Sequence, residues 1–123
     1  MSFRTTGPLY IEKRYRNGNN RFGLLLSNLT GSSHDVTVEL FAAPFTAPDT
    51  PETWTRIVLR TVTVPNNTVA NLVLDIPKGY PYYQFFINSA GEVRPALYLL
   101  DNLCDAVQDF PLIPNADWEI IPA

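Results

Sequence analysis

Residues 56–76 limit the fold more than any other part of this sequence, because they read as two β-strands joined by a turn. In the second half of the stretch, every other position is apolar and forms one unbroken face: Ala70, Leu72, Leu74 and Ile76. The first half is rich in β-branched residues, which pack well on a pleated sheet. Its alternation changes phase after Leu59, so we expect a β-bulge near Arg60 or Thr61. The turn is expected at residues 65–67, where a proline precedes two asparagines.

Shorter alternating runs recur along the chain, with turn signals between them. Further strands are expected at residues 9–16, 21–28, 35–41, 82–87, 93–100 and 118–121. Asn17-Gly18 predicts a hairpin between the first two of these. Residues 42–53 contain three prolines and are expected to form a long surface loop. Seven or eight short strands at this spacing predict an all-β fold, a single antiparallel β-sandwich or jelly roll.

The chain has 123 residues, of which 46% are hydrophobic, so it has the size and the apolar content of one folded domain. We expect an extended N-terminal arm at residues 1–8, hinged at Gly7-Pro8, and a β-sandwich domain at residues 9–123. No apolar run approaches the length of a membrane span, so membrane insertion is not expected. The opening residues lack the pattern of a signal peptide. The localisation therefore stays unassigned, although an extracellular or particle-surface location is favoured.

Few residues in the sequence suit catalysis, a metal or a cofactor. His34 and Cys104 are the single histidine and the single cysteine, and neither lies in a nucleophile or base motif. Cys104 is expected to be a small buried residue, with a bond between subunits as the alternative. Asp101, Asp105 and Asp109 have the spacing of one helix face, which suits calcium or, more simply, a solvated acidic surface. We therefore expect no enzyme, no catalytic residue, no metal ligand and no cofactor.

Charge is segregated along the chain, although the net charge is only −3. Residues 1–21 carry five basic residues against Glu12 alone, whereas residues 101–123 carry five acidic residues and no basic one. This pattern favours head-to-tail assembly of identical copies, with the arm adding as a strand to the sheet edge of a neighbour. The residues expected at this assembly interface are Phe3, Arg4, Leu9, Tyr10, Arg14, Arg16, Asp109, Asp117, Trp118 and Glu119.

Three tyrosines around one turn are the candidate ligand-binding residues: Tyr80, Tyr82 and Tyr83. Aromatic side chains beside a turn suit a glycan, and packing in the core or at a strand edge is the alternative. The basic residues near the N-terminus could contact phosphates, but the acidic balance of the whole chain argues against nucleic acid as a partner. Asn28 and Asn66 each begin an N-glycosylation pattern, which is common by chance.

Three segments resemble bacterial surface β-sandwich modules of the adhesion or spore-appendage type. They are VTVELF at residues 36–41, VPNNT at 64–68 and VLDIP at 73–77. The resemblance implies a non-catalytic role, and the N-terminal cysteines that cross-link such appendage subunits are absent here. We therefore expect a structural subunit that self-assembles into a fibre, an appendage or another surface assembly. A glycan-binding or adhesion module and a virion decoration or capsid-associated protein are the alternatives.

Overall fold

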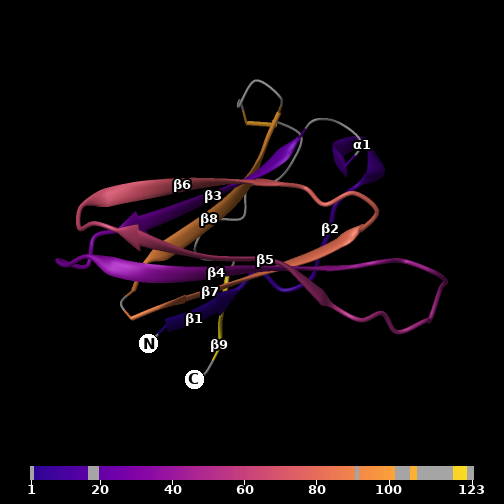
Figure 1. The fold of residues 1–123 in the computed structure, drawn as a ribbon, viewed down its shortest axis with the longest axis horizontal. Helices are drawn as coiled ribbons and strands as arrows, with labels where there is room; N and C mark the ends of the chain where they lie inside the picture. The colour runs from indigo at the N-terminus through magenta and orange to yellow at the C-terminus, as the bar shows by residue number, and fades with distance from the viewer. Residues whose placement is uncertain (1, 17–19, 91, 102–105, 108–117, 122–123) are drawn as a thin grey trace.

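The computed structural model describes residues 2–16, 20–90, 92–101, 106–107 and 118–121 (Figure 1). Within these residues, nine β-strands form two antiparallel sheets that pack face to face, and one short helix, α1 (Lys13–Arg16), lies outside the sheets. The predicted all-β antiparallel sandwich is confirmed, with nine strands described in place of the seven or eight expected.

The two sheets differ in size. The larger has the order β5-β4-β7-β1-β9, and β2 also pairs with β7. Its strands are β1 (Ser2–Thr5), β2 (Leu9–Tyr10), β4 (His34–Ala43), β5 (Thr55–Val64), β7 (Tyr82–Ser89) and β9 (Glu119–Ile121). The smaller sheet has the order β6-β3-β8, with β3 (Arg21–Asn28), β6 (Thr68–Asp75) and β8 (Arg94–Leu100).

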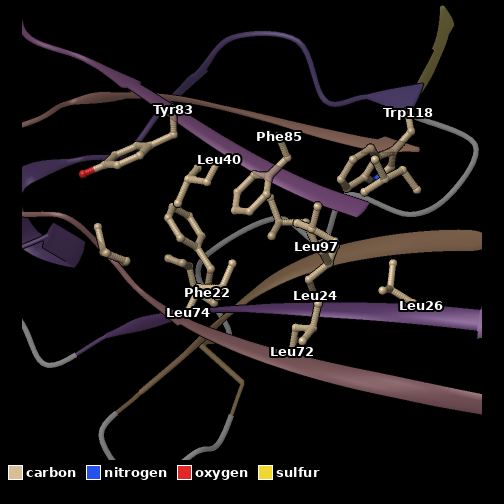
Figure 2. Close-up of a cluster of buried hydrophobic side chains, with 14 of the residues drawn as sticks. Phe22, Leu24, Leu26, Leu40, Leu72, Leu74, Tyr83, Phe85, Leu97 and Trp118 are labelled. Atoms are coloured by element: carbon tan, nitrogen blue, oxygen red, sulfur yellow. The ribbon is translucent and has the colours of Figure 1, made fainter. Parts of the chain in front are cut away.

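The core fills the space between the sheets with the alternate, inward-facing side chains of each strand (Figure 2). At its centre, the ring of Phe22 on β3 meets two rings of β7 edge to face. The centroid of Phe22 lies 5.3 Å from that of Tyr83 and 5.0 Å from that of Phe85. Trp118 closes one side of the core, with its ring centroid 6.5 Å from Phe85. The core therefore joins the central strands of the two sheets.

The structure corrects two expectations near the N-terminus. Residues 2–5 of the expected arm form β1, which lies inside the larger sheet between β7 and β9. The hairpin predicted between residues 9–16 and 21–28 is wrong, because β2 pairs with β7 while β3 pairs with β6 and β8. Ile11 and Tyr15 are both buried, and a spacing of four residues also suits a helical turn, which is what α1 forms. Asn17 and Gly18 lie outside the described residues.

Residues 56–76 do form two strands joined at residues 65–67, but each strand belongs to a different sheet. The predicted inward face of β6 is confirmed, since Leu72, Leu74 and Ile76 are buried and Ala70 is partly buried. The bulge predicted near Arg60 or Thr61 is wrong. The register shifts instead opposite Leu40 and Phe41, where Ile57 has no partner on β4. From Val58 onward the even-numbered residues face inward, so the apolar Leu59 is left on the outer face of an edge strand.

A buried asparagine ties the two sheets together at one end. Asn28, the last residue of β3, is fully buried, and its Nδ2 donates to the carbonyl oxygens of Ser32 (2.8 Å) and Val64 (2.7 Å). Its Oδ1 accepts from the backbone N–H of Thr30 at 3.0 Å and from the Thr30 hydroxyl at 2.8 Å. Because Val64 ends β5, these bonds join the smaller sheet to the larger one. The burial also removes Asn28 as a glycosylation acceptor in the folded protein.

We predict that Asn28→Ala lowers the free energy of unfolding by about 2–4 kcal/mol, because it removes the buried hydrogen bond to the Val64 carbonyl oxygen and the partly buried bonds to Ser32 and Thr30. The matched control is Asn66→Ala. The Oδ1 of Asn66 accepts one exposed hydrogen bond, from the N–H of Gly31 at 2.9 Å, so this loss should stay near or below about 1 kcal/mol. Urea denaturation of both variants measures the difference, and equal losses would contradict the role given to Asn28.

Candidate functional site

Three of the residues predicted at an assembly interface contact other residues of their own chain instead. Arg4 is buried, and its Nη2 donates to Glu92 Oε1 at 3.1 Å. Trp118 packs against Phe85, and Leu9 packs against the core from β2. Arg4 and Trp118 are therefore buried within their own chain, and Leu9 is partly buried. Asp109 and Asp117 lie outside the described residues.

The remaining predicted interface residues lie in separate places. Phe3 is half-buried on the outer face of the larger sheet, Tyr10 is exposed, and Glu119 is exposed on β9. Arg14 Nε donates to Glu12 Oε2 at 2.8 Å, and Arg16 Nε donates to the carbonyl oxygen of Ile11 at 2.8 Å. The first and last strands, β1 and β9, lie side by side (Figure 1).

The three candidate tyrosines occupy different environments. Tyr83 is fully buried, and its hydroxyl donates to the carbonyl oxygen of Pro77 at 2.7 Å. Tyr80 is partly buried against the core. Tyr82 faces the outer side of the larger sheet, where its ring centroid lies 5.9 Å from that of Tyr10 and 6.4 Å from that of Phe45. Tyr82 also lines a cleft.

That cleft, which we call the aromatic cleft, has a volume of about 290 Å³. It lies between the end of β4, the loop of residues 44–54 and the start of β7, and the loop extends beyond the end of the sandwich (Figure 1). Its lining residues are Ala43, Phe45, Ala47, Asp49, Thr50, Glu52, Trp54 and Tyr82. Aromatic rings and carboxylates therefore share one concave surface.

Hydrogen bonds within the loop fix the shape of the aromatic cleft. The backbone N–H of Thr50 donates to the carbonyl oxygen of Ala47 at 3.4 Å, which closes a turn over Pro48 and Asp49. Asp49 has a φ of 61°, a conformation that aspartate tolerates better than most residues. Glu52 Oε1 accepts from the backbone N–H of Thr46 at 3.0 Å and also from the Thr46 hydroxyl. Glu52 thereby joins the two arms of the loop.

A second cleft of about 400 Å³ is lined by Ser27, Leu29, Thr30, Glu92 and Arg94. Its two charged side chains, Glu92 and Arg94, lie close to each other, and Glu92 also pairs with the buried Arg4. Glu92 Oε1 lies 3.1 Å from Arg4 Nη2 and 4.0 Å from Arg94 Nε. The charged side chains of this cleft are therefore less available to a ligand than those of the aromatic cleft.

Two long strands, β5 and β6, each pair on one side only within the described residues. The β5 edge is irregular, because Ile57 bulges and Arg60 places a charge on the inward-facing side opposite Val38. Both features are common protections against edge-to-edge pairing. In β6, residues 68–74 contain no charge and no proline, and β6 pairs with β3 over eight consecutive residues without a bulge. The open edge of β6 is therefore regular and unprotected.

On the outer face of the smaller sheet, the Tyr98 side chain links β6 to the other two strands. The Tyr98 ring on β8 lies over Gly23 of β3, where an added Cβ would lie only 2.5 Å from Tyr98 Cζ. The Tyr98 hydroxyl then donates to Asn71 Oδ1 on β6 at 3.0 Å. One aromatic side chain thus spans all three strands and supports the regular geometry of the β6 edge.

Comparisons with known proteins support the fold and say little about the function. No protein-family model and no curated protein matches the chain. Among solved structures, the chain is similar to the crystal structure of Thermotoga maritima 1070, with a TM-score of 0.58 and 19% sequence identity. The match covers 97% of this chain and 90% of that one. At this identity the likeness shows the sandwich fold alone.

The described residues hold neither a membrane-spanning helix nor a metal-binding cluster. No helix there is long and apolar enough to cross a membrane. No group of three or more histidine, cysteine, aspartate or glutamate side chains is placed to hold a metal ion in that same part of the chain. The open edge of β6 and the aromatic cleft are therefore the candidate sites in the described part of the chain.

We predict that Tyr83 makes the stability of the protein fall at high pH. Burial raises the pKa of Tyr83 from 10.0 to about 12, although Arg16 acts in the opposite direction. The phenol loses its proton first in the unfolded chain, so its contribution is complete below pH 10 and is lost as the pH rises toward 12. Tyr83→Phe should cost about 1 kcal/mol at pH 8, through loss of the hydrogen bond to Pro77. It should also show a smaller decline in stability between pH 8 and pH 11, measured by urea denaturation beside the wild type. An unchanged decline would contradict this prediction.

Proposed function

We propose that this protein is a non-catalytic structural subunit that associates with further copies of itself through the open edge of β6. The observation that carries the proposal is the edge over residues 68–74, which is regular and uncharged and has no second pairing strand among the described residues. Such an edge presents backbone N–H and C=O groups to a second strand, which is how β-strand addition gains its affinity.

The contrast between the two sheet edges supports self-association rather than accidental exposure. Proteins that stay monomeric usually protect long edge strands with charges, prolines or bulges. This chain carries such features on β5, through Arg60 and the bulge at Ile57. Residues 68–74 of β6 lack such features, so the chain protects the edge of β5 and leaves the edge of β6 unprotected.

The partner that we propose for β6 is the same strand of a second copy, because the β6 sequence is compatible with itself. In a two-fold antiparallel pair centred on Asn71, Val69 lies opposite Val73 on the outer face, and Ala70 lies opposite Leu72 on the inner face. Neither pair brings like charges together, and the two copies of Asp75 stay apart at opposite ends. A contact of this kind uses the same surface on both subunits, which is the rule for two-fold dimers.

The β6 edge replaces the N-terminal arm as the associating element. The arm pairs with β7 and β9 of its own chain, and Arg4 is buried with Glu92. Donating the arm to a neighbour would therefore first break pairing that the molecule already makes. The β6 edge needs no such rearrangement, so self-association through it leaves the fold unchanged.

We predict that the wild-type protein forms a dimer of twice the 13.8 kDa chain mass, and that Val69→Lys weakens this dimer by more than about tenfold. The Val69 side chain is 60% exposed, so the monomer should tolerate lysine there. A lysine on an edge strand opposes pairing with another strand. Sedimentation equilibrium over a range of protein concentrations measures the dissociation constant.

The matched control is Leu59→Lys, which places the same charge at a 53% exposed apolar position on the β5 edge. This variant should keep the dissociation constant of the wild type. A wild-type protein that stays monomeric at high concentration would overturn the proposal. So would a dimer that Leu59→Lys disrupts and Val69→Lys leaves intact.

A further inference from the structure

We propose that the aromatic cleft binds an organic ammonium cation, such as a quaternary or methylated amine. This inference does not rest on self-association, because none of the lining residues belongs to β6. It rests on three properties of the cleft: exposed aromatic rings, a lining whose charged residues are all acidic, and rings that lie in different planes.

The first property is the exposure of large aromatic side chains around one small cavity. Phe45 is 55% exposed and Trp54 is 37% exposed, and both line the cleft together with Tyr82. Tyr10 adds a further exposed ring beside Tyr82, at 5.9 Å between centroids. Aromatic faces attract cations through their quadrupole, and tryptophan does so most strongly. The volume of about 290 Å³ is near the lower end of the range for small-molecule pockets, so it suits a compact group.

The second property is the charge of the lining. Asp49 and Glu52 are the two charged residues among the lining set, and both are acidic. Arg56, which follows shortly after Trp54, has its Nη1 3.4 Å from Glu39 Oε2 and is not a lining residue. Because Glu52 Oε1 is held by Thr46, its carboxylate has a defined position at the cleft. The lining is therefore complementary to a cation and repels phosphates and acidic ligands.

The third property separates a cation from a neutral sugar. The rings of Phe45 and Tyr82 are inclined at 64° to each other, with 6.4 Å between centroids. One face of a pyranose chair cannot stack on both of two rings that are so steeply inclined. A rounded trimethylammonium group can contact aromatic side chains from several directions at once, as in the aromatic cages that hold methylated amines. The geometry thus favours the cation over the glycan that the tyrosines alone suggest.

The experiment is a titration of the ¹⁵N-labelled protein with choline chloride, followed by the indole N–H signals in two-dimensional NMR. The chain has two tryptophans, and they report on different places. Trp54 lines the cleft, whereas Trp118 is buried against Phe85 and serves as an internal reference. Trp54→Phe assigns the two signals, and sodium chloride at matched concentrations removes effects of salt.

We expect choline to shift the Trp54 signal in a saturable way, with a dissociation constant on the order of millimolar, as suits a shallow site for a small ligand. The Trp118 signal should stay in place. The neutral isostere 3,3-dimethyl-1-butanol, in which carbon replaces the charged nitrogen, should bind at least about tenfold more weakly. The double variant Asp49→Asn, Glu52→Gln should weaken choline binding by about five- to tenfold and keep the hydrogen-bond acceptor that Thr46 needs.

The matched control for charge removal is Asp75→Asn, an exposed carboxylate on β6 of the other sheet, which should leave choline binding unchanged. Equal binding of choline and its neutral isostere would overturn the proposal and indicate an apolar pocket. A shift of Trp54 with cellobiose but not with choline would overturn it in favour of a saccharide site. The absence of any Trp54 shift with choline would also overturn it.

Discussion

The contact between Phe22 and the rings of Tyr83 and Phe85 is the interaction on which the rest of the structure depends. It joins β3, the central strand of the smaller sheet, to β7, which lies near the centre of the larger one. Once these two strands face each other, the remaining strands can add only outward. The consecutive strands β5 and β6 then become edges of different sheets. The open edge of β6 thus belongs to the strand beside β3, which carries Phe22.

The fold class followed from the sequence because strand alternation depends on neighbouring residues alone. Leu72, Leu74 and Ile76 face inward as their pattern predicts. Sheet membership did not follow, because two strands joined by a short turn can either pair or cross between sheets. Here the crossing is fixed by long-range bonds. Asn28 binds the carbonyl oxygen of Val64 at 2.7 Å, and the N–H of Asn67 binds the carbonyl oxygen of Asn28 at 2.8 Å. No local pattern encodes a bond across 36 or more residues.

The candidate sites were predictable only in part, for a similar reason. Tyr82, one of the three tyrosines predicted to bind a ligand, lines the cleft, but Phe45 and Trp54 lie in a loop that was predicted only from its prolines. Two aromatic residues in or beside such a loop are the one local signal that could have pointed to the cleft. Charge segregation along the sequence does not tell which charged side chains reach the surface. Arg4 is buried and paired with Glu92 instead.

The two proposed sites are compatible because they use different parts of the sandwich. Pairing through β6 involves the smaller sheet, whereas the aromatic cleft is built from β4, the loop of residues 44–54 and Tyr82 of the larger sheet. A two-fold dimer would therefore carry two clefts in a fixed relative orientation. For a target that displays many ammonium groups, the second contact becomes intramolecular, so a site of weak intrinsic affinity gains strength without any new contact. Self-association would in this way turn a shallow cleft into an effective binding surface.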